Sequence, residues 1–330
     1  MKKIYFWYKN ARPSALPQSV FPAVLAGVMA FNCSDFSVLY SILAITGVVL
    51  LHLSVNLFDD YFDYKNHDVK IRNELAENKM FSRTGKCNYL VSKEASLKQL
   101  FCVATFLLLF AAVLGGIIFL YRGIFILYLM VTGGVLGLSY SAKPFCLSYR
   151  GLGEITIGIM FGPLLMTGVF YAACGLYIPA VGLVSSSVGL LVGNIEFTHS
   201  ILDYHPDKYE RKKTLAVLIK STKAQFVFSC FFTLIPFVLI GYGIALNYLS
   251  MWYALVLLTF PLGVYLVYSI HAFFRYPKQQ FSPCFLTGPM GNWKKRQQNG
   301  TDWFMFRWYL ARNLTMFFCI LSIIASVLSF

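Results

Sequence analysis

The sequence predicts an all-α integral membrane protein in which a single domain, residues 1–330, crosses the bilayer about nine times. Of its 330 residues, 58% are hydrophobic and only 13% are charged, which is more apolar surface than a soluble domain of this length could bury. Apolar runs of about 20 residues recur along the whole chain, and each is long enough to span a bilayer. No soluble domain or low-complexity linker separates these runs.

The expected helices can be placed in order from these apolar runs. The predicted spans are residues 14–32, 38–58, 98–120, 123–141, 152–172, 176–202, 224–246, 250–271 and 303–328. The sixth span is long enough to tilt or to protrude from the bilayer. We expect no cleavable signal peptide, because Pro13 and Pro17 precede the first span and no small-residue cleavage site follows it.

The positive charge is distributed as membrane topology requires. The net charge is +14, and 25 of the 28 Lys and Arg residues fall in five stretches, 1–13, 59–98, 142–151, 203–223 and 272–302. The alternate connections hold only Arg122, while Arg307 and Arg312 lie within the last span. This pattern predicts a cytoplasmic N-terminus, cytoplasmic cap loops near 59–97 and 203–223, and no nucleic-acid partner.

The eight Cys residues show no metal-binding spacing and are expected to be free thiols.

A first acidic motif stands where the second predicted span ends. Asp59 and Asp60 precede Asp63 by four and three residues, so a continuing helix would place each of them on the same face as Asp63. Asn56 lies one turn earlier, and Asp68 follows in the loop. Solvation of a helix end in the headgroup layer is the simpler explanation, although anions at a helix C-terminus oppose the helix dipole.

A second acidic motif ends the sixth predicted span, on the same side of the membrane. It consists of Asp203 and Asp207, with Asn194 and Glu196 upstream on the approach to it. His199 also lies near this end, where an ionisable side chain usually has a function. For His52, in the second predicted span, a hydrogen bond between helices is the favoured explanation.

Together the two motifs predict a metal–phosphate site. Carboxylates this close repel one another and are stable mainly with a cation between them. Hard oxygen ligands beside basic residues favour Mg²⁺ holding a phosphate-bearing substrate, and the candidate metal ligands are Asp59, Asp60, Asp63, Asp68, Asp203 and Asp207. Cationic side chains would stabilise departing negative charge, and the candidates are Arg12, Lys65, Arg72, Arg83, Lys143, Lys212 and Lys213. For each of them, a topology charge is the simpler explanation.

Two further segments are ambiguous in the sequence. Glu154, at the start of the fifth span, is either an interfacial residue or a partner of a substrate-binding residue. The segment 272–302, with Lys294, Lys295 and Arg296, is interpreted as a solvated connector near anionic lipid.

With both motifs in view, the chain resembles the UbiA superfamily of intramembrane aromatic prenyltransferases. The resemblance covers most of the length and rests, besides the acidic motifs, on Arg12-Pro13, Tyr140-Ser141-Ala142-Lys143-Pro144, Gly151-Leu152-Gly153-Glu154 and Phe161-Gly162-Pro163. Within the superfamily, the segments 60–63 and 212–217 look most like the MenA branch. These enzymes join a polyprenyl diphosphate to 1,4-dihydroxy-2-naphthoate.

The resemblance implies a bundle of nine membrane helices around a central cavity, with two Asp motifs binding Mg²⁺-diphosphate from opposite walls. It gives catalytic roles to two pairs of acids, Asp60 and Asp63 in the first motif and Asp203 and Asp207 in the second. The residues expected to bind substrate are Asn56, Arg12, Lys143, Asn194, Lys212 and Lys213.

The implied function is transfer of a polyprenyl group from a prenyl diphosphate to 1,4-dihydroxy-2-naphthoate in menaquinone biosynthesis, with Mg²⁺ as cofactor, in a bacterial cytoplasmic membrane. Another aromatic acceptor, such as 4-hydroxybenzoate, is an alternative. A cation-coupled transporter is a further alternative, but its acids would be expected near the bilayer midplane on broken helices. A CDP-alcohol phosphotransferase is disfavoured, because its Asp-Gly-x-x-Ala-Arg core is absent after Asp60 and Asp63.

Overall fold

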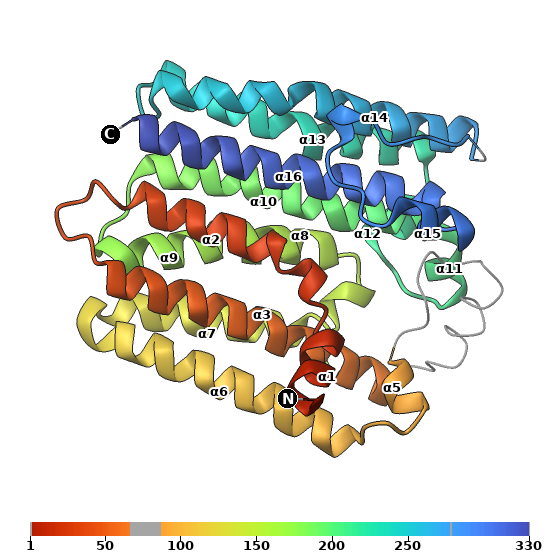
Figure 1. The fold of residues 1–330 in the computed structure, drawn as a ribbon, viewed down its shortest axis with the longest axis horizontal. Helices are drawn as coiled ribbons and strands as arrows, with labels where there is room; N and C mark the ends of the chain where they lie inside the picture. The colour runs from red at the N-terminus through yellow and green to blue at the C-terminus, as the bar shows by residue number, and fades with distance from the viewer. Residues whose placement is uncertain (1, 67–86, 278, 330) are drawn as a thin grey trace.

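The computed structural model describes residues 2–66, 87–277 and 279–329, and this part of the chain is helical with no strand. Its long helices lie side by side in a nearly parallel stack (Figure 1). Seven helical segments are long and apolar enough to cross a membrane: α3 Val38–Asn66, α6 Leu97–Arg122, the continuous α8–α9 segment Gly153–Cys174, α10 Pro179–Leu202, α13 Thr222–Ala245, the segment Met251–Arg275 ending in α14 Phe260–Arg275, and α16 Asp302–Leu328. The predicted all-α membrane fold is confirmed.

The two remaining predicted spans are apolar helices of less than full crossing length. They are α2, Pro17–Met29, with 13 residues, and α7, Ile124–Ser139, with 16 residues. At 1.5 Å per residue these helices measure only about 20 and 24 Å, against a hydrocarbon core of about 30 Å. Prolines explain the late start of α2, because Pro13 begins a separate short 3₁₀ turn and Pro17 occupies the first helical position.

Short helices gather at one end of the bundle (Figure 1). They are α1 Lys2–Asn10, α5 Asn88–Val91, α11 Tyr204–Tyr209, α12 Leu215–Ile219 and α15 Trp293–Gln298. The C-terminus lies at the opposite end of the bundle (Figure 1). The predicted cap segment 203–223 is thus built mainly from α11 and α12, while much of the other predicted cap lies outside the described residues.

Arg122, the one basic residue of the alternate connections, has a structural role. Its guanidinium donates from Nε to the Ala172 carbonyl at 2.9 Å and from Nη2 to the Ala173 carbonyl at 2.7 Å. These carbonyls belong to the last turn of α9, Leu165–Cys174, where helix carbonyls lack partners within the helix. The side chain therefore closes a helix end, which accounts for its departure from the charge pattern.

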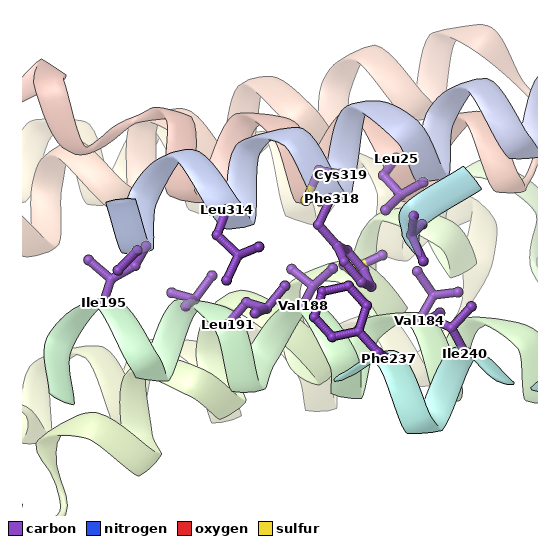
Figure 2. Packing of buried hydrophobic residues seen from close by; sticks show 14 of the residues in the cluster. Leu25, Val184, Val188, Leu191, Ile195, Phe237, Ile240, Leu314, Phe318 and Cys319 are labelled. Carbon is purple, nitrogen blue, oxygen red and sulfur yellow. The ribbon is translucent and has the colours of Figure 1, made fainter. Parts of the chain in front are cut away.

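The central helix of the bundle is α10, which is the most buried of the candidate spans. It packs against α13, α16 and α8, Gly153–Ile159. Figure 2 shows apolar side chains from one face of α10 meeting those of α13 and α16: Val184, Val188, Leu191, Ile195, Phe237, Ile240, Leu314 and Phe318. Because α10 is covered on several sides, the acidic motif at its end is held by a rigid support.

Glycines bring α10 into backbone contact with the segment around α8. A Cβ atom added at Gly162 would lie 2.4 Å from both the Gly189 Cα and the Ser185 carbonyl oxygen. Small residues at a membrane helix crossing allow this approach and gain packing contacts along the backbone. Gly162 lies in a π-helical turn, Met160–Leu164, whose Pro163 lacks the N–H that a regular helix would use.

Candidate active site

The first acidic motif occupies the last two turns of α3, and Arg12 pairs with two of its three carboxylates. The Arg12 Nη1 lies 3.1 Å from the Asp59 carboxylate, and its Nη2 contacts the Asp60 carboxylate. Both acids and the arginine line one cavity. Because Arg12 bridges two carboxylates that would otherwise repel, it holds Asp59 and Asp60 together.

Arg12 reaches this position through an unusual turn between α1 and α2. Its backbone adopts the left-handed conformation, with φ of 57°. The Asn56 Nδ2 donates to the Ala11 carbonyl at 3.0 Å, which ties this turn to α3. Asn56 also lines the cavity, so its observed role is to place the Arg12 turn beside the acids.

Three hydroxyl groups orient the carboxylates of the first motif. The Tyr89 hydroxyl donates to Asp60 at 3.1 Å, and the Tyr149 hydroxyl donates to Asp63 at 3.1 Å. The Ser141 hydroxyl donates to Asp59. Burial, followed by the charge of Asp60, raises the pKa of Tyr89, which keeps this phenol protonated as a donor.

The second motif forms a line of ionisable groups on one face of α10. The His199 Nε2 lies 3.1 Å from an oxygen of Asp203, and its Nδ1 lies 3.9 Å from Glu196. All three side chains line the same cavity as the first motif. The imidazole thus lies between two carboxylates, and the site holds acidic groups from α3 and from α10.

Asp207 and Glu154 are buried outside the cavity lining and contact residues around the second motif. Asp207 is buried and lies 3.8 Å from the Lys212 Nζ, and of these two only Lys212 lines the cavity. The buried Glu154 accepts hydrogen bonds from the Ser200 hydroxyl on α10 and from the Leu215 N–H that begins α12. Of the two possibilities for Glu154, the structure favours a supporting role, since it ties α8 to α10 and α12.

The cavity has a volume of about 1500 Å³ and continues from the acidic motifs into the apolar interior. Its polar end holds the acids, Arg12 and Lys212; its apolar part is lined by residues such as Val48, Leu129 and Leu164. Ordinary small-molecule pockets measure about 300–1000 Å³, so this space suits one large ligand or two ligands together. A ligand with an anionic head and a long apolar tail matches both parts.

Several predicted substrate-binding residues lie elsewhere. The buried Asn194 Nδ2 donates to the Thr233 hydroxyl on α13 at 2.9 Å, and Asn194 is not among the cavity-lining residues. Three predicted cations are exposed and outside the lining, namely Lys65, Lys143 and Lys213. Asp68, Arg72 and Arg83 lie outside the described residues. His52 makes the expected hydrogen bond between helices, 2.7 Å from the Ser19 hydroxyl, and it also lines the cavity.

The C-terminal wall of the cavity is a part of the site that the sequence interpretation missed. Arg296, which was expected in a solvated connector, lines the cavity together with Trp308, Tyr309 and Arg312. The available sequence signal was Arg312, because an ionisable residue inside a span usually faces a cavity or a partner.

The donor set fits Mg²⁺, although the described residues hold no ready-made metal centre. No group of three or more His, Cys, Asp or Glu side chains in the described ranges is arranged to hold a metal ion. Mg²⁺ usually keeps several waters and binds through one or two carboxylates together with substrate phosphates. Asp60, Asp63 and Asp203 supply such carboxylate oxygens on the walls of one cavity.

Fold and site together define an integral membrane protein with an internal cavity. Acidic side chains lie at one end of this cavity, and its lining suits an amphipathic ligand. The chain belongs to the UbiA prenyltransferase family, which matches residues 19–287. This membership confirms the resemblance drawn from the motifs and favours a transferase over a transporter.

Curated relatives with named activities are similar over about two thirds of the chain. The 1,4-dihydroxy-2-naphthoate octaprenyltransferase of Escherichia coli (strain K12) is 22% identical over 226 residues, 68% of this chain and 71% of the relative. The enzyme of the same name from Haemophilus influenzae is 26% identical over 247 residues, 69% of this chain and 73% of the relative.

Solved structures share the fold over nearly the full length. A digeranylgeranylglyceryl phosphate synthase matches with a TM-score of 0.64 at 17% identity, covering 99% of both chains. A UbiA homologue from Archaeoglobus fulgidus bound to DMAPP and Mg²⁺ matches with a TM-score of 0.57 at 14% identity, covering 96% of this chain and 98% of that one. At these identities the likeness supports the fold.

Proposed function

We propose that the protein transfers a polyprenyl group from a prenyl diphosphate to 1,4-dihydroxy-2-naphthoate, in a Mg²⁺-dependent reaction of menaquinone biosynthesis. The observation that carries this proposal is the single cavity with carboxylates of both motifs at its polar end and an apolar interior beyond them. Family membership supports prenyl transfer, and the names of the relatives support this acceptor.

The cavity follows α3 from the apolar interior to the first acidic motif. Cavity-lining residues of α3 extend from Leu43 to Asp63, a distance of about 30 Å along the helix. Each CH₂ group of an isoprenoid chain buried there gains about 0.8 kcal/mol over exposure to water. The apolar part of the cavity would therefore hold the prenyl chain of the donor, with the diphosphate at the acidic end.

The residues at the polar end suit ionisation of the donor. When bound by Asp60, Asp63 and Asp203, Mg²⁺ would supply positive charge to the diphosphate. Arg12 and Lys212 line the same end and add cationic groups for the departing negative charge. As the C–O bond breaks, its electron pair leaves with the diphosphate.

The rest of the cavity suits the coupling step. Apolar walls keep water from the allylic cation, and ring faces such as those of Phe161 and Phe304 can stabilise it. An electron-rich carbon of the acceptor then forms the new C–C bond. Loss of the carboxylate as CO₂, whose bonding electron pair stays on the ring, restores aromaticity with no net release of a proton. Glu196 and His199 line the cavity, where they can take a proton from a hydroxyl of the naphthoate during the attack and return it afterwards.

The proposed reaction is expected to require a divalent metal and a specific acceptor. Membranes containing the protein should transfer labelled prenyl groups to 1,4-dihydroxy-2-naphthoate when Mg²⁺ is present, and EDTA should abolish the transfer because the carboxylates alone repel the diphosphate. Thin-layer separation of the labelled lipid measures this. Transfer that persists in EDTA would contradict the metal requirement, and preference for 4-hydroxybenzoate would favour the alternative acceptor.

We also propose that the acidic end faces the cytoplasm of a bacterial cell, as the charge distribution indicates. Tyr209 on α11 at the acidic end and Tyr248 after α13 are 68% and 50% exposed, which makes them a matched pair. In a Cys-free variant, Tyr248→Cys should react with a membrane-impermeant maleimide on intact spheroplasts, whereas Tyr209→Cys should react only after lysis. The reverse labelling pattern would overturn this orientation.

A further inference from the structure

The cavity wall formed by α15, the following turn and the first turns of α16 carries cations without acids. Its lining residues include Arg296, Phe304, Trp308, Tyr309 and Arg312, and no Asp or Glu between residues 296 and 312 lines the cavity. This wall lies beyond residues 19–287, the part of the chain matched by the family. It is therefore a feature that the family assignment does not describe.

Arg312 places a guanidinium inside the last span, about 15 Å along α16 from Asp302. Its Nε and Nη2 donate to the Asn313 Oδ1 at 3.2 and 2.8 Å, and Nη2 also donates to the Pro289 carbonyl at 2.8 Å. These acceptors are neutral, and the Nη1 group has no protein partner among the described residues. In contrast, Arg12 at the other wall pairs with two carboxylates.

Aromatic rings surround the two arginines of this wall. The Arg312 guanidinium lies 4.4 Å from the Tyr309 ring centroid and 5.8 Å from that of Trp308. The Arg296 Nη2 donates to the Tyr309 hydroxyl at 3.4 Å. The Trp308 indole N–H is buried without a hydrogen-bond partner in the described part of the chain. The wall thus combines unneutralised guanidinium donors, a spare N–H and flat ring surfaces.

Such a wall requires an anion from the ligand. A charged group within a membrane span is costly unless it pairs with a counter-charge or faces water, and no carboxylate of residues 296–312 lines the cavity in the described part of the chain. Arg binds a carboxylate through two parallel N–H groups, and aromatic faces stack on a planar ring. The donor diphosphate is matched instead by the acidic wall, which attracts Mg²⁺.

We propose that Arg312, with Arg296, Tyr309 and Trp308 beside it, forms the subsite that binds the carboxylate of an aromatic acceptor. This inference rests on the proposed prenyl transfer and names the residues that select an acidic over a neutral acceptor. Arg312 is the central residue, because it lies deepest along α16 and keeps free donors. The two substrates then bind to different walls of one cavity. The donor diphosphate, with Mg²⁺, binds at the acidic wall, and the acceptor carboxylate binds at the wall that carries the arginines.

The test removes the charge from the protein and from the acceptor in turn. Arg312→Gln should raise the KM for 1,4-dihydroxy-2-naphthoate about 10- to 100-fold, the worth of a charge-assisted hydrogen bond. The KM for 1,4-dihydroxynaphthalene, which lacks the carboxylate, and the KM for prenyl diphosphate should change little. Arg312→Lys should give an intermediate KM. Arg275→Gln, an exposed arginine outside the cavity lining, serves as the control.

The outcomes separate this inference from the proposed function. Equal losses with both acceptors would show that Arg312 only supports the fold through Pro289 and Asn313, and a raised KM for prenyl diphosphate would assign it to the donor; either result overturns the inference. Binding of unreactive 2-naphthoate, followed by quenching of tryptophan fluorescence, needs no turnover. Arg312→Gln and Arg296→Gln should each weaken this binding relative to wild type. Unchanged binding overturns the subsite, whereas weakened binding without any prenyl transfer overturns the proposed function alone.

Discussion

Replacing Asp63 by Asn is expected to lower the rate of prenyl transfer by about 10²- to 10³-fold, and Asp203→Asn should have an effect of similar size. Both carboxylates line the cavity at its polar end, one on α3 and one directly after the last residue of α10. Asn keeps the size of the side chain and removes its charge, so the loss would report electrostatics rather than packing. Initial rates at saturating Mg²⁺ and prenyl diphosphate measure the effect.

The double variant tests whether the two motifs act on one diphosphate. If they act as a unit, Asp63→Asn combined with Asp203→Asn should lose little more activity than either single variant. Asp35→Asn changes an exposed carboxylate outside the cavity lining and should leave the rate unchanged. Losses that multiply in the double variant would indicate independent roles, such as diphosphate binding by one motif and proton transfer by the other.

Gly162→Val is expected to destabilise the fold by about 3 kcal/mol or more, because the added atoms would overlap the backbone of α10. A Cβ there lies 2.4 Å from the Gly189 Cα and the Ser185 carbonyl oxygen, and neither backbone atom can move without shifting the helix. Thermal unfolding of the detergent-solubilised protein should show a large fall in Tm. Loss of activity should follow, since α10 carries the second acidic motif.

The matched control for this crossing is Gly241→Val. Gly241 lies on α13 and has no heavy atom within 4 Å of an added Cβ. Both substitutions add the same atoms to a membrane helix, so the difference between them isolates the contact of the Met160–Leu164 turn with α10. A Gly162→Val protein as stable as Gly241→Val would show that the two helices can separate without loss of the fold.

Residue spacing along a helix explains which parts of the site could be predicted. Glu196 and His199 precede Asp203 by seven and four residues, which is close to two turns and one turn, and all three line the cavity. Asn194 precedes Asp203 by nine residues, or about two and a half turns, and therefore lies on the opposite face toward Thr233. Applying the helical period to this segment would have separated Asn194 from Glu196, His199 and Asp203.

The sequence by itself determined the membrane fold, the helical segments and the end of the bundle that carries acids. These follow from hydrophobicity and charge, which each segment possesses without its neighbours. It also indicated Arg12 through the family resemblance, but not its partners. Only the packing of distant helices decided that Arg12 meets Asp59 and Asp60, and that Arg312 faces the same cavity. Such contacts join residues far apart along the chain, and a local pattern does not specify which helix faces meet.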